Sequence, residues 1–177
     1  MVGSLLLVLG VSIGVSASSG YDRQEADACI TISQRLSVKG GSYSIPTEKQ
    51  LHDSIAEWTR MEESLANSNR QLNKFNTATV AYDVTTGNYY YGMNRGIQIS
   101  GDSLNPSLKS WLPESSLNEF RLGNCAEVDA VNQALNDGAD IKNLYLYTIN
   151  TKNNLHKAMC KNCVYTFKNR VADIFSK

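Results

Sequence analysis

Apolar residues recur at helical spacing soon after residue 45. They fall on one face of a predicted helix, which they would turn toward a sheet: Leu51, Ile55, Trp58 and Leu65. Thr47 and Gln50 stand three residues apart ahead of this run, which is the spacing of a capping box. Residues 25–36 also carry a helical pattern, although Ile30 and Ile32 fit a short strand as well. The first part of the chain is therefore predicted to be helical.

The later pattern changes to strands and short helices. Residues 77–82 and 89–93 are rich in β-branched and aromatic residues on either side of a turn signal at 85–88, which predicts a hairpin. A loop-rich stretch with a helical turn at 107–111 follows. The pattern then predicts a helix, a strand, a helix and a strand, over 125–136, 144–149, 159–168 and 171–175. This order predicts a three-layered α/β domain whose central strand is buried on both faces.

The N-terminal residues differ from the rest. Residues 5–15 are apolar and uncharged, and small residues follow at 15–19, which is typical of a secretory signal peptide cleaved after Ala17. The run is shorter than the roughly 20 residues of a membrane-spanning helix. We therefore expect a secreted protein that does not bind membranes after the signal is removed. The predicted division is a signal peptide at 1–17, a helical extension at 18–74 and a functional domain at 75–177.

Composition narrows the functional classes. The chain has 177 residues, with 17 Lys and Arg against 17 Asp and Glu, so its formal net charge is zero. This balance argues against stable binding of duplex DNA. Only two histidines are present, which excludes a multi-histidine metal cage. The four cysteines are the most informative of the rarer residues: Cys29, Cys125, Cys160 and Cys163.

Positive charge gathers near the C-terminus. Residues 141–177 contain seven Lys or Arg and a single acidic residue, Asp173. Such a region could attract the phosphates of a nucleotide or of a single strand. A positively charged, solvated face needs no ligand, so both interpretations stay open.

Three cysteines lie at the predicted starts of two helices. Cys125 opens one helix, and Cys160 and Cys163 open the next, with the central strand between them. Two helices that leave the same end of neighbouring strands would bring these thiolates together, and zinc is the metal that such soft ligands favour. Three protein ligands leave the fourth position for water, as in catalytic zinc sites. Cys29 has no assignment.

Glu127 follows Cys125 by two residues, so its carboxylate would lie beside this predicted metal. A carboxylate there could take a proton from a zinc-activated water and hand it to a leaving amine. The zinc deaminases of nucleobases carry His or Cys, one residue and Glu, followed later by Pro-Cys-x-x-Cys. This chain has Cys-Ala-Glu at 125–127 and Met-Cys-x-x-Cys at 159–163.

Residues 123–168, with the hairpin at 77–94, resemble the YwqJ-like deaminases, a toxin-associated branch of the cytidine deaminase-like superfamily. The resemblance implies a cytidine deaminase-like fold, a mixed sheet flanked by helices, and a toxin or effector with a possible immunity protein as partner. It also implies that Cys125, Cys160 and Cys163 hold Zn²⁺, that Glu127 is the general acid/base, that Asn94 contacts the substrate, and that the Ala126 N–H binds the base carbonyl. The substrate would be a nucleobase in a nucleotide or a single strand. Met159 departs from the family's proline.

Two disulfides are the competing interpretation of four cysteines in a secreted chain. They would leave the spacing of Glu127 and the positions at helix starts unexplained. The alternative function is a non-catalytic binding or structural protein on a deaminase-like or disulfide-stabilised scaffold. Among the other polar and aromatic residues, Asp129 is predicted to be solvated, and the strand tyrosines are candidates for stacking a base: Tyr89, Tyr90, Tyr91, Tyr145 and Tyr147.

Overall fold

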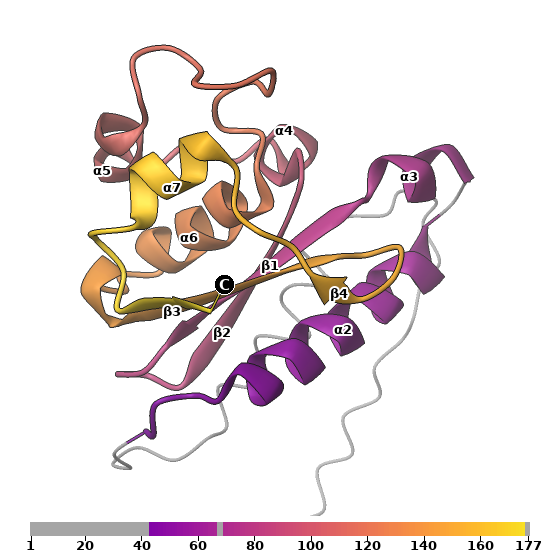
Figure 1. The fold of residues 1–177 in the computed structure, drawn as a ribbon, viewed down its shortest axis with the longest axis horizontal. Coiled ribbons are helices and arrows are strands. Elements are labelled where there is room, and N and C mark those ends of the chain that lie inside the picture. Colours follow the sequence, from indigo (N-terminus) through magenta and orange to yellow (C-terminus); the bar gives the residue numbers. More distant parts are fainter. Residues whose placement is uncertain (1–42, 67–68, 176–177) are drawn as a thin grey trace, which may run out of the picture.

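The computed structural model describes residues 43–66 and 69–175 (Figure 1). The predicted signal peptide, the pattern at 25–36 and Cys29 lie outside these residues. The helices are α2 (Glu48–Leu65), α3 (Asn69–Lys74), α4 (Gly96–Ser100), α5 (Pro106–Trp111), α6 (Ala126–Asn136), the 3₁₀ turn η1 (Ile141–Asn143) and α7 (Lys161–Phe167). The strands are β1 (Thr77–Asp83), β2 (Asn88–Met93), β3 (Leu144–Asn150), β4 (Leu155–His156) and β5 (Asp173–Phe175).

The strands form one mixed sheet in the order β2-β1-β3-β4, with β5 also paired to β3. β1 runs antiparallel to both β2 and β3, which confirms the predicted hairpin and places β1 and β3 at the centre. β5 runs parallel to β3 at one end, near Tyr145, and β4 runs antiparallel to it at the other end, near Ile149. The pattern did not predict β4, because two residues are too few for a periodic signal.

Helices cover both faces of this sheet, so the three-layered α/β architecture predicted from the element order is present (Figure 1). α6 and α7 lie on one face, where Val128, Leu146 and Phe167 belong to one buried cluster. α2 lies on the other face, where Trp58 and Ile149 belong to a second cluster. The described part of the predicted N-terminal extension therefore supplies one layer of the fold.

α2 begins as the sequence predicts. Thr47 is its N-cap, and the side chains of Thr47 and Gln50 each accept a hydrogen bond from the other's backbone N–H, which completes the capping box. Leu51, Ile55 and Trp58 are buried against the sheet. The prediction for Leu65 is wrong, because this last residue of α2 is 44% exposed. The buried residues of α2 end at Thr59, so the last turn of the helix is not packed into the core.

α6 packs closely against β2. A Cβ on Gly92 would lie 2.3 Å from the backbone N of Ala130 and 2.4 Å from the backbone O of Ala126, so only glycine fits at this position. The buried carboxylate of Asp129 accepts a hydrogen bond from the Met93 N–H at 2.9 Å. The prediction that Asp129 is solvated is therefore wrong, because this residue covers the outer edge of β2.

None of the helices in the described ranges combines the length and the apolarity needed to cross a membrane. The loop-rich stretch between β2 and α6 contains α5, as predicted, and also α4, which the pattern missed.

Candidate metal centre

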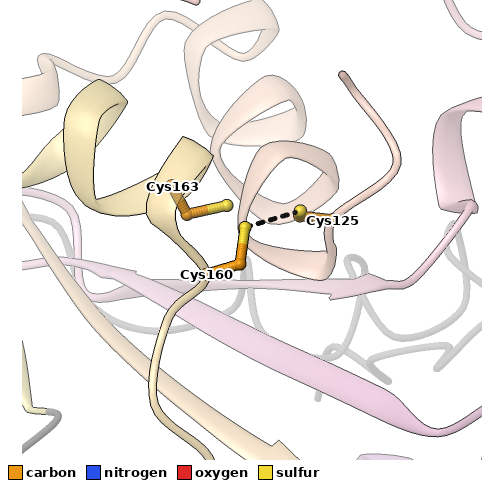
Figure 2. A group of neighbouring side chains, drawn as sticks. All are labelled: Cys125, Cys160 and Cys163. Atoms are coloured by element: carbon orange, nitrogen blue, oxygen red, sulfur yellow. Dashed lines mark hydrogen bonds between the residues drawn. The ribbon is translucent and has the colours of Figure 1, made fainter. Parts of the chain in front are cut away.

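The N-termini of α6 and α7 meet on one face of the sheet. Cys125 is the N-cap of α6, and Cys160 is the N-cap of α7 with Cys163 in its first turn. Both N-cap residues have extended backbone conformations, and neither side chain caps its own helix. The three sulfur atoms point toward one another instead (Figure 2). The convergence of these three cysteines, which the sequence predicts from the order helix, strand, helix, is therefore present in the structure.

The spacing of the sulfur atoms fits a metal with thiolate ligands. All three Sγ atoms lie within 4.8 Å of one another, and those of Cys125 and Cys160 are 3.4 Å apart. Tetrahedral zinc with Zn–S bonds of about 2.3 Å places its sulfur ligands about 3.8 Å apart, within this range. The described cysteines are free, and 3.4 Å is far longer than a disulfide bond of about 2 Å. The three side chains could hold one metal ion.

The three thiols hold their protons unequally. The hydrogen bond between Cys125 and Cys160 lowers the pKa of Cys160 and raises the pKa of Cys125. Hydrogen bonds with Cys125 and Cys160, together with burial, raise the pKa of Cys163 well above its ordinary value. The metal-free cluster therefore favours one thiolate, on Cys160, to which the Cys125 thiol donates.

Glu127 lies directly beside the cluster. Its side chain is only 4% exposed, and its Oε2 accepts a hydrogen bond from the Cys163 thiol at 3.5 Å. Its Oε1 accepts one from the Thr148 hydroxyl of β3, also at 3.5 Å. Burial raises the pKa of this carboxyl, while the positive charge of Lys157 acts in the opposite direction. A buried carboxyl with a raised pKa next to candidate metal ligands is suited to moving protons near neutral pH.

A polar loop is fixed over the start of α7. The buried side chain of Asn162 accepts a hydrogen bond from the Leu117 N–H at 2.8 Å and donates to Ser116 and Asn118. Asn118 in turn contributes to lowering the pKa of Cys160. This loop therefore holds a polar side chain against the cysteine cluster. No local sequence signal predicts this role, because it depends on contacts across more than forty residues.

Comparisons of the chain with protein-family models, with curated proteins and with solved structures found no match. The family resemblance and the roles that it implies therefore stay predictions, and the case for the site depends on its geometry.

Asn94 follows β2 and contacts the start of β1. Its Oδ1 accepts hydrogen bonds from the N–H groups of Asn76 and Thr77, both at 3.1 Å, and its Nδ2 donates to the Lys74 carbonyl at 2.7 Å. The next residue, Arg95, donates its N–H to the Asn124 carbonyl, immediately before Cys125. These contacts fix the strand end next to the site. The contact of Asn94 with a substrate stays a prediction. It would have to form in addition to these hydrogen bonds or replace one of them.

Ala126 is fully buried and is the first residue of α6, next to Cys125. Its predicted contact with a base carbonyl is not tested by these positions.

The five strand tyrosines lie away from the cysteine cluster. Four of them pack on the α2 side of the sheet, and Tyr90 donates its hydroxyl proton to Asp137 at the opposite end of α6 from Cys125. The pleat of the strands turns the first four rings to the face opposite the cysteines, whereas Tyr90 lies on the cysteine face but at the far end of α6. The neighbours of Glu127 that the sequence did not single out are Thr148 and Lys157.

Proposed function

We propose that the protein is a zinc-dependent hydrolytic deaminase that acts on a nucleobase in a nucleotide or a single-stranded nucleic acid. The observation that carries the proposal is the buried carboxyl of Glu127 beside three converging cysteines. A structural zinc site needs no buried carboxyl next to its ligands, and burying a carboxyl costs stability unless it is paired or hydrogen-bonded. A buried carboxyl beside candidate ligands therefore favours a role in proton transfer. The three-cysteine set leaves one position of a tetrahedral zinc open to water.

The arrangement of the elements supports a cytidine deaminase-like fold of the YwqJ-like type. A hairpin is followed by a helix, a central strand, a second helix and a strand that pairs parallel to the central one. The two candidate ligand motifs stand at the starts of the two helices on one face of the sheet. Together with the signal peptide predicted at 1–17, membership in this family would make the protein a secreted toxin or effector. An immunity protein is then the expected partner.

The roles of the residues follow from their positions. Cys125, Cys160 and Cys163 would hold zinc, which when bound supplies Lewis acidity and activates water at neutral pH. Glu127 accepts a proton from the attacking water and delivers it to the adjacent ring nitrogen as the water oxygen adds to the ring carbon. The remaining hydroxyl proton then passes through Glu127 to the amino group, which leaves as ammonia while the ring carbon becomes a carbonyl. The Thr148 hydroxyl holds one oxygen of Glu127, so the carboxyl keeps its orientation.

Replacing Glu127 tests this role. Glu127→Ala in the zinc-loaded protein should lower ammonia release by about a hundredfold or more, because the general acid/base is lost. Substrates are screened by mass change over nucleosides, nucleotides, single-stranded DNA and RNA. Zinc content should stay at the wild-type level. Glu57→Ala is the matched control, since this exposed residue lies on α2, on the other face of the sheet.

Two outcomes would contradict the proposal. Ammonia release that survives Glu127→Ala with zinc bound would remove Glu127 from the reaction. A zinc-loaded wild-type protein that deaminates nothing in the panel would instead favour a non-catalytic binding protein on this scaffold.

A further inference from the structure

Lys157 is bound to the same strand residue that contacts Glu127. Its backbone N–H donates to the Thr148 carbonyl at 2.9 Å, and the Thr148 hydroxyl donates to Glu127 at 3.5 Å. The Thr79 and Thr148 hydroxyls are 2.8 Å apart on neighbouring strands, so a polar strip crosses the sheet here. Lys157, the residue after β4, therefore lies at the edge of the candidate site, next to the strand residue that contacts Glu127.

The ammonium group of Lys157 is held by a hydroxyl. It donates to Thr77 Oγ1 at the start of β1, two residues before Thr79 on the same face of the strand. The Lys157 side chain is half-buried, and Thr77 is buried. The Thr77 hydroxyl donates its own proton to Asn76 Oδ1 at 2.8 Å. The partly desolvated ammonium of Lys157 is therefore the group that would bind an anion here, through its remaining N–H donors.

Five of the six positively charged residues described between 141 and 175 lie near one end of the sheet or the other. Lys142 lies at the start of β3, and Arg170 packs over the Trp111 ring at 5.6 Å, away from the cysteines. Lys152 follows the other end of β3 and donates to the Leu72 carbonyl, and Lys161 follows Cys160. The basic stretch noticed in the sequence therefore contributes three lysines to the end of the sheet that bears the site.

We propose that Lys157 binds a phosphate group of the substrate, so that the substrate is a phosphorylated nucleoside rather than a free base or nucleoside. This inference deepens the proposed function and rests on it. The phosphate could belong to a free nucleotide or to a single strand, and both present the same chemistry to an ammonium group.

Binding measurements separate these sources. Binding is measured in the zinc-loaded Glu127→Gln protein, so that the probes are not deaminated during the measurement. The probes are AMP, CMP, GMP and UMP, their four nucleosides, and a fluorescein-labelled mixed-sequence single-stranded DNA. Lys157→Ala should weaken binding of the preferred monophosphate about tenfold and leave its nucleoside unchanged, as expected for one charge-assisted hydrogen bond. Lys157→Arg should retain most of the affinity. Lys142→Ala removes the same charge at the far end of β3 and should change neither.

An effect on the labelled strand alone, with a salt dependence whose slope falls by about 0.7, would assign the phosphate to a nucleic acid. Equal losses for nucleoside and monophosphate, equal effects of Lys157→Ala and Lys142→Ala, or no binding of any probe would overturn the inference. Lys157-dependent phosphate binding without ammonia release by the wild-type protein would contradict the proposed reaction alone. Deamination of nucleosides at a rate that Lys157→Ala leaves unchanged would contradict this inference alone.

Discussion

The three thiols of the cluster differ in whether they carry a proton that a metal must displace. Cys125 and Cys163 have raised pKa values in the metal-free protein and keep their protons at neutral pH, whereas the lowered pKa of Cys160 makes it a thiolate already. A metal binds thiolates, so its binding must release the protons of the first two. The cluster is in this respect different from three independent thiols of ordinary pKa.

Near pH 6, where a zinc-bound water with a pKa of about 7 keeps its proton, zinc binding should release about two protons from the thiols. The affinity should rise about a hundredfold per pH unit. Calorimetry of zinc binding in buffers of different ionisation enthalpy measures the number released. Glu127→Gln is the right background, because the carboxyl cannot then add a proton of its own. Release of about three protons would show that Cys160 is an ordinary thiol and would contradict the proposed sharing.

At the scale of elements, the position of Cys125 depends on the contact between α6 and β2. The two backbone atoms that a Cβ on Gly92 would meet belong to α6 and cannot rotate away. Because Cys125 is the N-cap of this helix, any displacement of α6 also moves one candidate ligand.

Gly92→Ala should destabilise the metal-free protein by about 1 to 3 kcal/mol, as overpacking does, and should also weaken zinc binding. Urea unfolding gives the first quantity, and competition with a chromophoric chelator gives the second. Gly138→Ala is the control, because Gly138 has φ +92 and open space around its Cα just beyond the other end of α6. It should lose stability through backbone strain and keep its zinc affinity. Equal zinc affinities in both variants would disprove the coupling.

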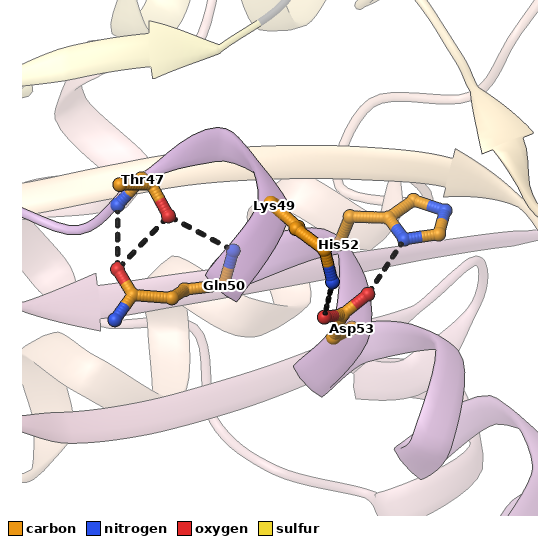
Figure 3. Close-up of polar contacts among 5 residues, drawn as sticks. All are labelled: Thr47, Lys49, Gln50, His52 and Asp53. Carbon is orange, nitrogen blue, oxygen red and sulfur yellow. Dashed lines mark hydrogen bonds and ion pairs between the residues drawn. The ribbon is translucent and has the colours of Figure 1, made fainter.

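The elements that the sequence predicts well are those with local signals. Figure 3 shows the capping box of Thr47 and Gln50 at the start of α2, which the three-residue spacing predicts, beside the ion pair of Lys49 with Asp53 on the exposed side. The hairpin and α6 have equally local patterns. The predicted burial of Leu65 is wrong because it depends on how far the packing of α2 against the sheet extends. The predicted exposure of Asp129 is wrong because it depends on which side chain accepts the Met93 N–H of β2.

At the scale of the whole molecule, the topology decides which residues share the site. The C-terminal ends of β2 and β3 and the N-terminal end of β1 lie together, since β1 is antiparallel to both neighbours. The starts of α6 and α7 follow at this end, so cysteines from separate motifs meet. The order of elements was enough to predict that meeting. Thr148 and Lys157 could not be predicted, because they come to Glu127 through strand register.

The central claim is that three cysteines hold zinc with one position left for water. Zinc-edge X-ray absorption of the purified protein tests it most directly. We predict three sulfur ligands at about 2.3 Å and one oxygen or nitrogen ligand at about 2.0 Å. Four sulfur ligands would mean that Cys29, outside the described residues, closes a structural site. Either that result or a zinc-free protein with its cysteines in disulfides would contradict the account.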